Sequence, residues 1–328
     1  MRTVAAWAQV SHQTVSRVLN DHPHVSAPAR RRVEEAIDAL GYRLNPAARS
    51  LVTRRSRTMG VLVMELAEYG PSQILLGFER AAREEGFFVS IASVQGVSST
   101  EMRAALEHLE GQAVEGIAVI VSREGASRAI KNLDTSVPVV WAGAHSADAP
   151  DAGTVDQRSG ARKAVDHLLD LGHRRIGHVS GPLDWYDATE RLEGWKDALE
   201  SAGLAADLLF SGDWTAEHGY LSGLRIAGSS ILTAVFAASD QIALGLLRGL
   251  QEGGLRVPDD VSVVGYDDQP AAAYFSPPLT SVRVDFEHEG RRCWDVLASR
   301  IQGGDAARIP TMFPELVVRR STRCCGEV

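Results

Sequence analysis

Cysteine is scarce in this sequence, and long apolar runs are absent. The only cysteines are Cys293, Cys324 and Cys325. They lack metal-ligand spacing, and a bridge between adjacent cysteines would be strained, so we expect neither a metal site nor a disulfide framework. No run of about 18 apolar residues occurs, which argues against a membrane span. The N-terminus also lacks the pattern of a secretory signal, and this predicts a cytoplasmic protein.

The common catalytic motifs are missing as well. The sequence contains no G-x-S-x-G elbow, no Walker loop, no H-E-x-x-H pair and no dinucleotide-binding fingerprint. Asp259-Asp260 and Asp267-Asp268 could be taken for paired catalytic carboxylates, but the side chains of adjacent residues usually point apart. We therefore expect a protein that is not an enzyme and that needs no cofactor or metal ion.

Positive charge is concentrated in the first part of the chain. The whole sequence has a net charge of −8, yet residues 1–58 hold ten arginines and four acidic residues, which makes this segment +6 and the remainder −14. Such asymmetry is typical of a basic module for a polyanion joined to an acidic body. A solvated basic tail is the alternative.

Residues 1–58 have the pattern of short helices joined by turns. An apolar stretch begins at Val4, and Ser11 can cap a second helix over residues 12–20. Ser26 can cap a third helix, which has Pro28 in its first turn and ends at Gly41. Two short helices joined by a tight turn predict a helix-turn-helix, whose second helix enters the major groove of DNA.

The polar side chains of the second helix suit contact with DNA. Gln13 can bond adenine and Arg17 guanine in a bidentate manner. Ser11, Thr14, Ser16 and Asn20 are short hydrogen-bonding residues that can hold phosphates. An ordinary helical hairpin with a polar face is the alternative interpretation.

From Met59 onward, apolar strands alternate with amphipathic helices. This predicts an α/β core of two doubly wound parallel sheets, since about 270 residues exceed one such unit. Two helices are expected over Ser72–Glu85 and Ser159–Leu171. The expected strands are Gly60–Met64, Phe87–Ala92, Gly116–Val121, Pro138–Trp141, Arg175–Ser180, Ala234–Ala238 and Val261–Tyr266.

The chain resembles the lac/galactose repressor family of bacterial transcription regulators. The V-S-x-x-T-V-S-R-V-x-N pattern over residues 10–20 carries the likeness at the N-terminus, and residues 171–176, 191–195, 238–245 and 257–268 carry it in the core. The resemblance implies a small helical headpiece followed by a periplasmic-binding-protein-like core. It also implies a dimer that binds a palindromic operator and a small-molecule effector.

The resemblance assigns roles to individual headpiece residues. It implies that His12, Gln13 and Arg17 read bases, while His24 and Ser26 contact the DNA backbone. Residues 45–51 match the family's hinge helix, which enters the minor groove of DNA. In that helix the contact residues would be Asn45, Ala48, which allows close approach, and Leu51, which wedges between base pairs.

In the core, the resemblance implies a sugar site in the crevice between two α/β units. Arg191 and Asp267 would hold sugar hydroxyls, and Ser239 and Asp240 would lie at the rim. Trp214 and Phe286 would pack on the apolar face of the sugar. Met64, Ile120 and Gly143 stand where a lac-type pocket has polar side chains, so a different glycoside is as plausible as a galactoside.

The expected organisation has three segments. Residues 1–44 form the headpiece, 45–58 the hinge helix and linker, and 59–328 the effector-binding and dimerisation core. The core would divide into an N-subdomain (59–154 and 285–312) and a C-subdomain (155–284 and 313–328). We expect a dimer, because the leucine heptads of a tetramerising tail are missing.

Two departures from the family pattern concern the headpiece. Gln9 occupies a turn position that suits glycine, and the first helix starts almost at Met1, which predicts a shortened headpiece with reduced operator affinity.

Three alternatives to a sugar-released repressor remain: an activator, a corepressed regulator with a nucleobase-like ligand, and a transport-type solute-binding protein. The missing secretory signal and the headpiece both argue against the last of these.

Overall fold

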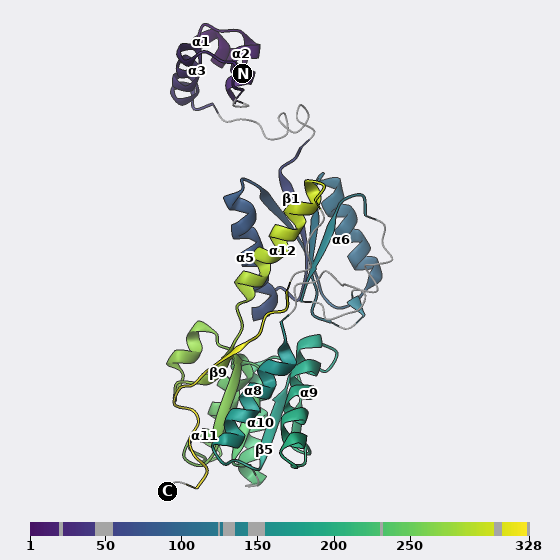
Figure 1. Ribbon diagram of the computed structural model, residues 1–328, viewed down its shortest axis with the longest axis vertical. Coiled ribbons are helices and arrows are strands. Elements are labelled where there is room, and N and C mark those ends of the chain that lie inside the picture. Colours follow the sequence, from purple (N-terminus) through teal and green to yellow (C-terminus); the bar gives the residue numbers. More distant parts are fainter. Residues whose placement is uncertain are drawn as a thin grey trace. The chain divides into compact units, whose positions relative to one another are not determined.

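The chain forms two compact units, Met1–Ser56 and Arg57–Val328, which are described separately (Figure 1). The predicted contact residues Asn20, Asn45, Ala48 and Leu51 lie outside the described residues. Within the described part of the chain, no helix is long and apolar enough to cross a membrane. The computed structural model describes residues 1–19, 22–42, 55–123, 125–126, 135–143, 155–229, 232–304 and 310–326.

The first unit contains three helices, α1 (Arg2–Trp7), α2 (His12–Leu19) and α3 (Ala27–Leu40). The Ser11 Oγ accepts a hydrogen bond from the Thr14 amide at 3.1 Å and so caps α2, as predicted. Ser26 occupies the N-cap of α3, but its side chain makes no capping hydrogen bond. The three helices share one small core, formed by Val4, Ala5, Ala8, Val15, Val18, Val33 and Ala36.

The second unit begins with a four-stranded parallel sheet in the order β2-β1-β3-β4. Helix α5 (Tyr69–Glu84) packs on one face and α6 (Ser99–Gly111) on the other (Figure 1). Helix α12 (Phe286–Ile301) lies beside α5, although in sequence it follows the strand Thr280–Arg283 of the second sheet. The strands are β1 (Thr58–Met64), β2 (Phe88–Val94), β3 (Ile117–Ile120) and β4 (Val139–Ala142).

The second sheet has six strands in the order β10-β9-β8-β7-β5-β6, parallel except for the β9–β10 pair. Successive side chains of β7 point to opposite faces of this sheet, and helices cover both faces. Phe236 packs toward α8 and α9, whereas Val235 packs toward α10 and α11. The strands are β5 (Ile176–Ser180), β6 (Leu209–Ser211), β7 (Ala234–Ala237), β8 (Ser262–Asp267), β9 (Thr280–Arg283) and β10 (Glu315–Val317). The helices are α8 (Gln157–Asp170), α9 (Tyr186–Ser201), α10 (Ala216–Ser229), α11 (Asp240–Glu252) and the 3-10 turn η1 (Pro270–Tyr274).

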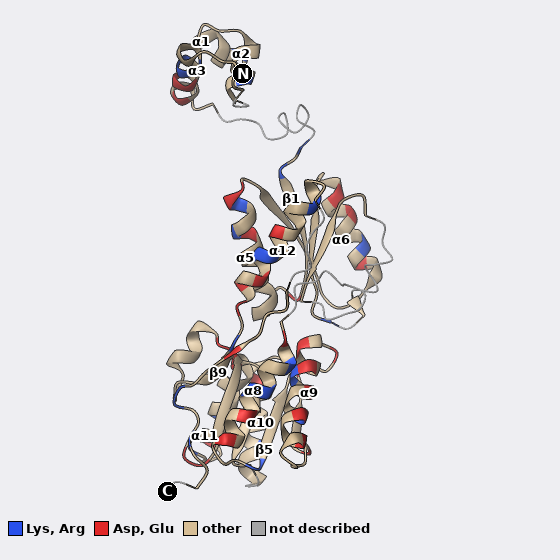
Figure 2. Ribbon diagram, viewed as in Figure 1, with Lys and Arg blue, Asp and Glu red and all other residues tan. Residues whose placement is uncertain are grey.

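Charged residues occur along the helices of both sheets (Figure 2). Some of them form ion pairs between neighbouring helices. Arg291 of α12 bonds Glu84 of α5 at 2.6 Å, and Arg158 of α8 bonds Asp197 of α9 at the same distance. These pairs are largely exposed, so each adds little stability and mainly keeps the surface polar. The apolar faces beneath them hold the layers together.

The predicted α/β class and the seven predicted strands are confirmed, with ends that differ from the predicted ones by at most two residues. Strands β6, β9 and β10 were not predicted, because each is short and only β9 is largely buried. Helix α5 begins at Tyr69, three residues before the predicted Ser72. Pro71 lies in the first turn of α5, where proline is tolerated because its missing amide costs nothing.

Candidate functional site

The exposed face of α2 is the candidate DNA-contacting surface. His12, Gln13 and Arg17 are exposed, whereas Val15 and Val18 are buried against the other two helices. Gln13 and Arg17 are one helical turn apart and therefore lie on the same face. Within the described residues, the Arg17 guanidinium has no ion-pair or hydrogen-bond partner. The side chains predicted to read bases are thus available together on one side of the unit.

The residues predicted to contact the DNA backbone flank this surface. Ser11 and Thr14 bond each other through their hydroxyl oxygens at 2.9 Å at the start of α2. His24 and Ser26 are exposed in the loop before α3 and at its N-cap, and Ser16 is half-buried on α2. Short polar groups at helix starts suit phosphate oxygens.

Gln9, in the turn between α1 and α2, has a φ of 52°, which is the left-handed region predicted from its position. Replacing Gln9 with glycine should stabilise the first unit by up to about 1 kcal/mol, because glycine adopts this conformation without a Cβ clash. Hydrogen exchange of the Val15 and Val18 amides in the full chain would report the gain. Gln9→Ala is the control and should give none; lower protection in Gln9→Gly would contradict the expected strain.

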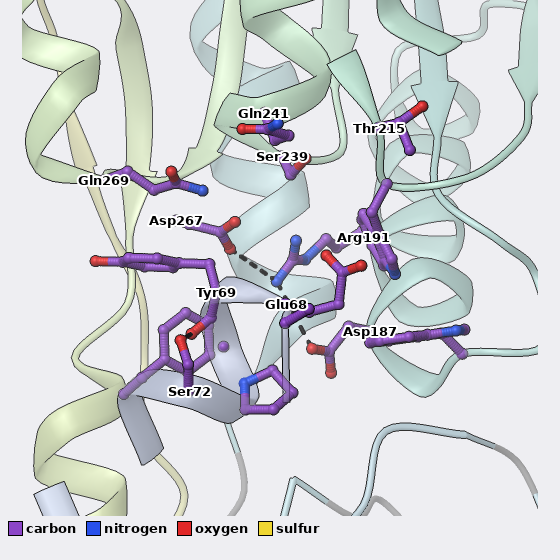
Figure 3. Close-up of a pocket in the computed structure, with 16 residues that line it drawn as sticks. Glu68, Tyr69, Ser72, Asp187, Arg191, Thr215, Ser239, Gln241, Asp267 and Gln269 are labelled. Carbon is purple, nitrogen blue, oxygen red and sulfur yellow. Dashed lines mark hydrogen bonds and ion pairs between the residues drawn. The ribbon is translucent and has the colours of Figure 1, made fainter. Parts of the chain in front are cut away.

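The second unit contains a cavity of about 380 Å³ between its two sheets (Figure 3). It lies at the carboxyl ends of the strands, where open α/β sheets bind ligands. One side is formed by residues 67–72 at the start of α5 together with Phe286 of α12, and the other by residues of the second sheet's loops and helices. The latter are Trp185, Asp187, Arg191, Trp214, Thr215, Ser239, Gln241, Asp267 and Gln269.

Arg191 of α9 is buried and fixed by hydrogen bonds, an ion pair and ring stacking. It is only 2% exposed, its Nε donates to the Gln157 side chain at 3.0 Å, and its Nη1 donates to the Ala238 carbonyl at 2.6 Å. Its Nη2 lies 3.2 Å from the Asp267 carboxylate, and its guanidinium stacks 3.8 Å from the centre of the Tyr266 ring. These contacts leave the cation little freedom and aim it at the cavity beside Asp267 (Figure 3).

Asp267 ends β8 and faces Arg191 (Figure 3). Its φ of 97° is unusual for a residue with a side chain, and such strain is common at binding sites. Burial raises the pKa of the Asp267 carboxyl to about 7, while the Arg191 charge opposes that rise. The pair can thus donate and accept hydrogen bonds to the same ligand, which suits adjacent hydroxyl groups.

The two residues expected at the rim have different positions. Ser239 lines the cavity, and its Oγ also caps α11 by accepting from the Ile242 amide. Asp240 has no exposed surface, contrary to the expected rim position. Its carboxylate accepts from Ser281 Oγ and from the Gln269 amide, both at 2.6 Å. Asp240 therefore lies behind the cavity wall and orients the loop that follows Asp267.

Aromatic side chains form much of the cavity wall. Trp214 and Phe286 line it as the resemblance implied, and both are at least nine-tenths buried. Two further aromatics, Trp185 and Tyr69, were not predicted. Trp185 meets Trp214 edge to face at 5.5 Å, and Tyr69 meets Phe286 in the same way at 6.1 Å. Flat apolar walls around an arginine–carboxylate pair match the two faces of a sugar ring.

Met64, Ile120 and Gly143, which replace the polar side chains of a lac-type pocket, do not lie together. Ile120 and Gly143 line a smaller cavity that adjoins the first. Met64 is instead fully buried in the core beneath α6, so its expected place in the pocket is wrong. The reason is strand alternation, because Met64 ends β1 with its side chain on the sheet face opposite α5.

Arg123, in the loop after β3, connects the loops of the two sheets. Its guanidinium bonds Glu65, which follows β1 of the first sheet, at 3.0 Å, and it also bonds Asp184, which follows β5 of the second sheet. The same guanidinium stacks over the Trp185 ring. The Tyr186 amide adds a backbone bond to the Ser122 carbonyl at 3.0 Å. These contacts join the two halves of the second unit next to the cavity.

The described residues contain no group of histidine, cysteine or acidic side chains able to hold a metal ion.

An exposed recognition helix in one unit and a sugar-sized cavity in the other are the components of a ligand-responsive DNA-binding regulator. Residues 1–45 match the family described as bacterial regulatory proteins, lacI family, and residues 165–322 match the periplasmic binding protein-like domain.

Similar proteins agree with this class. The transcriptional regulator CelR of Thermobifida fusca is 38% identical, covering 98% of this chain and 97% of CelR. A crystal structure of the lac repressor dimer bound to operator and the anti-inducer ONPF has a TM-score of 0.89, at 34% identity over 98% of both chains. A CelR–cellobiose complex has a TM-score of 0.72, at 35% identity, and covers 97% of this chain and 98% of CelR.

The chain belongs to the lacI family of bacterial regulatory proteins. It is a DNA-binding transcription regulator, and the family is one of regulators and not of enzymes.

Proposed function

We propose that this regulator is a homodimeric repressor that leaves a palindromic operator when a sugar or glycoside binds in the 380 Å³ cavity. The buried Arg191–Asp267 pair within an aromatic wall is the observation that carries the effector class. Cellobiose bound to CelR, and the anti-inducer ONPF bound to the lac repressor, support a saccharide over a nucleobase. A repressor of chromosomal genes acts in the cytoplasm, and there we place it.

We assign residues 1–44 to operator binding, 45–58 to the hinge and 59–328 to effector binding and dimerisation. A palindromic operator needs two copies of the α2 surface, and this is why we propose a dimer. His12, Gln13 and Arg17 would read bases, while Ser11, Thr14, Ser16, Asn20, His24 and Ser26 would hold phosphates. Asn45, Ala48 and Leu51 would act in the minor groove.

The proposed coupling between sugar binding and operator release follows from the position of the cavity between the two sheets. A sugar that bonds Arg191 and Asp267 on one side, and packs on Phe286 on the other, favours one relative arrangement of the two halves. That arrangement would move the N-terminal subdomains within the dimer and separate the hinge segments. By linkage, sugar and operator then weaken each other's binding by the same factor.

A gel-shift titration tests the proposal. An operator is first selected from a pool of random duplexes with the full chain, and the complex is then titrated with cellobiose, lactose, D-glucose, D-galactose and hypoxanthine. We expect release by at least one sugar and a sedimentation mass of two chains. Tighter binding with hypoxanthine and no effect of any sugar would instead establish a corepressed regulator.

A further inference from the structure

The smaller cavity adjoins the first. Its volume is about 20 Å³, which is room for about one water-sized group. The two cavities share Gly70, Pro71, Asp187 and Phe286 in their walls, so they are direct neighbours. The rest of its wall is Ile74, Ile120, Val121, Ser122, Gly143, Val155, Gln157 and Glu289.

Glu289 is the unusual member of this wall. It follows Phe286 by three positions on α12, which places both side chains on the same face of the helix. Glu289 is only 2% exposed, and its Oε1 accepts from the Gly143 amide at 3.0 Å. Among the described residues, this is the carboxyl's one hydrogen bond. A buried carboxyl can make several such bonds, so most of its capacity remains for a ligand.

Gly143 presents its amide to Glu289 because of its backbone conformation. Its φ is +74°, and a Cβ at this position would lie 2.6 Å from the Val121 carbonyl oxygen. Only glycine can therefore turn the chain here after β4 and aim its N–H at the carboxyl. The Glu289–Gly143 pair is thus held by the local fold in the wall of the smaller cavity.

The electrostatic setting keeps Glu289 uncharged. Burial raises the pKa of Glu289 to about 8, the Asp187 charge raises it further, and the Gly143 amide and Arg292 oppose the rise. At neutral pH the carboxyl then carries its proton and can both donate and accept a hydrogen bond. Burying such a group beside Ile74 and Ile120 costs stability unless a partner satisfies it.

We propose that Glu289 lines an inner subsite that receives one hydroxyl group of the bound saccharide and disfavours an alkyl group in its place. Glu289 and the Gly143 amide define its polar end, and Phe286 and Pro71 connect it to the larger cavity. An alkyl group there would leave the buried carboxyl without its ligand partner. This inference rests on the proposed function, in which a sugar bonds Arg191 and Asp267.

The test compares Glu289→Leu and Glu289→Gln in the full chain by calorimetric titration with cellobiose, lactose, D-glucose and D-galactose. For a sugar that binds the wild type, we expect Glu289→Leu to weaken binding at least tenfold. Glu289→Gln should stay within about threefold, since its amide also donates and accepts. Glu287→Leu is the matched control and should bind as wild type, because Glu287 is on the same helix but outside both cavity walls.

Thermal unfolding without sugar separates a ligand role from a structural one. Glu289→Gln should unfold at the wild-type temperature, since its side-chain oxygen still accepts from the Gly143 amide, whereas Glu289→Leu loses that bond but also removes a costly buried polar group. Unchanged sugar binding by Glu289→Leu, or a lower unfolding temperature in both variants, would overturn the subsite while leaving the proposed function intact. If the wild type binds none of the four sugars, the proposed function fails, and the subsite with it.

Discussion

Replacing Arg191 with alanine should abolish release from the operator by sugar and leave operator binding itself intact. Arg191 is the only cation in the wall of the larger cavity among the described residues, and its bonds to Gln157, Ala238 and Asp267 hold it ready for the ligand. Losing its charge-assisted bonds to sugar should weaken effector binding by at least about 100-fold, or about 3 kcal/mol.

The sugar needed for half-release in a gel-shift titration measures this effect. Arg248→Ala is a matched control, because Arg248 is exposed on α11, pairs with Glu252 and lies outside the cavity wall. Since Arg191→Ala leaves Asp267 buried without its partner and can lower stability, Asp267→Asn provides a second variant with the same expected loss. If Arg191→Ala responds to wild-type sugar concentrations, the cavity is not the effector site.

Replacing Arg17 with alanine should remove most sequence-specific binding to the operator. A bidentate arginine–guanine contact contributes about 1–3 kcal/mol of discrimination. Two half-sites in the proposed dimer double this to about 2–6 kcal/mol, which is a loss of at least about 30-fold in affinity. Arg17 is exposed on α2 and its guanidinium has no partner among the described residues, so the change should leave the fold of the first unit unaltered.

Competition with non-specific DNA separates base reading from simple charge attraction. Arg17→Ala should lose affinity for the operator far more than for random duplex DNA, because phosphate contacts are independent of sequence. Arg31→Ala is the control: Arg31 is exposed on α3, pairs with Glu35 at 2.9 Å and lies outside the recognition helix. Equal losses for operator and random DNA in Arg17→Ala would show that Arg17 contacts phosphate and not a base.

Local patterns in the sequence were sufficient for the recognition helix. The spacing of Val15 and Val18 determines which face of α2 is buried, and helix geometry then exposes Gln13 and Arg17. Ser11 caps the helix through a bond to a residue three positions away, which a short motif can reveal. The strands of the two sheets were recognisable for a similar reason, since they are buried apolar runs bounded by helices.

The cavity required more than local pattern. Arg191 and Asp267 were found through the family resemblance. Trp185 was missed, because the only local sign that it lines the cavity is its position after the end of a strand. Asp240 was misplaced because sequence adjacency to Ser239 suggested a shared position, although the start of α11 turns the two side chains apart.

By itself, the sequence determined the basic headpiece and the α/β class of the core, and through its family motifs it pointed to the arginine–carboxylate pair of the proposed effector site. Each of these depends on residues close together in the chain or on a recognisable motif. Tertiary structure alone decided that α12 crosses back to the first sheet, bringing Phe286 and Glu289 to Gly143 of a distant strand end. The physical reason is that such contacts join segments more than a hundred residues apart, whose meeting depends on how whole layers pack.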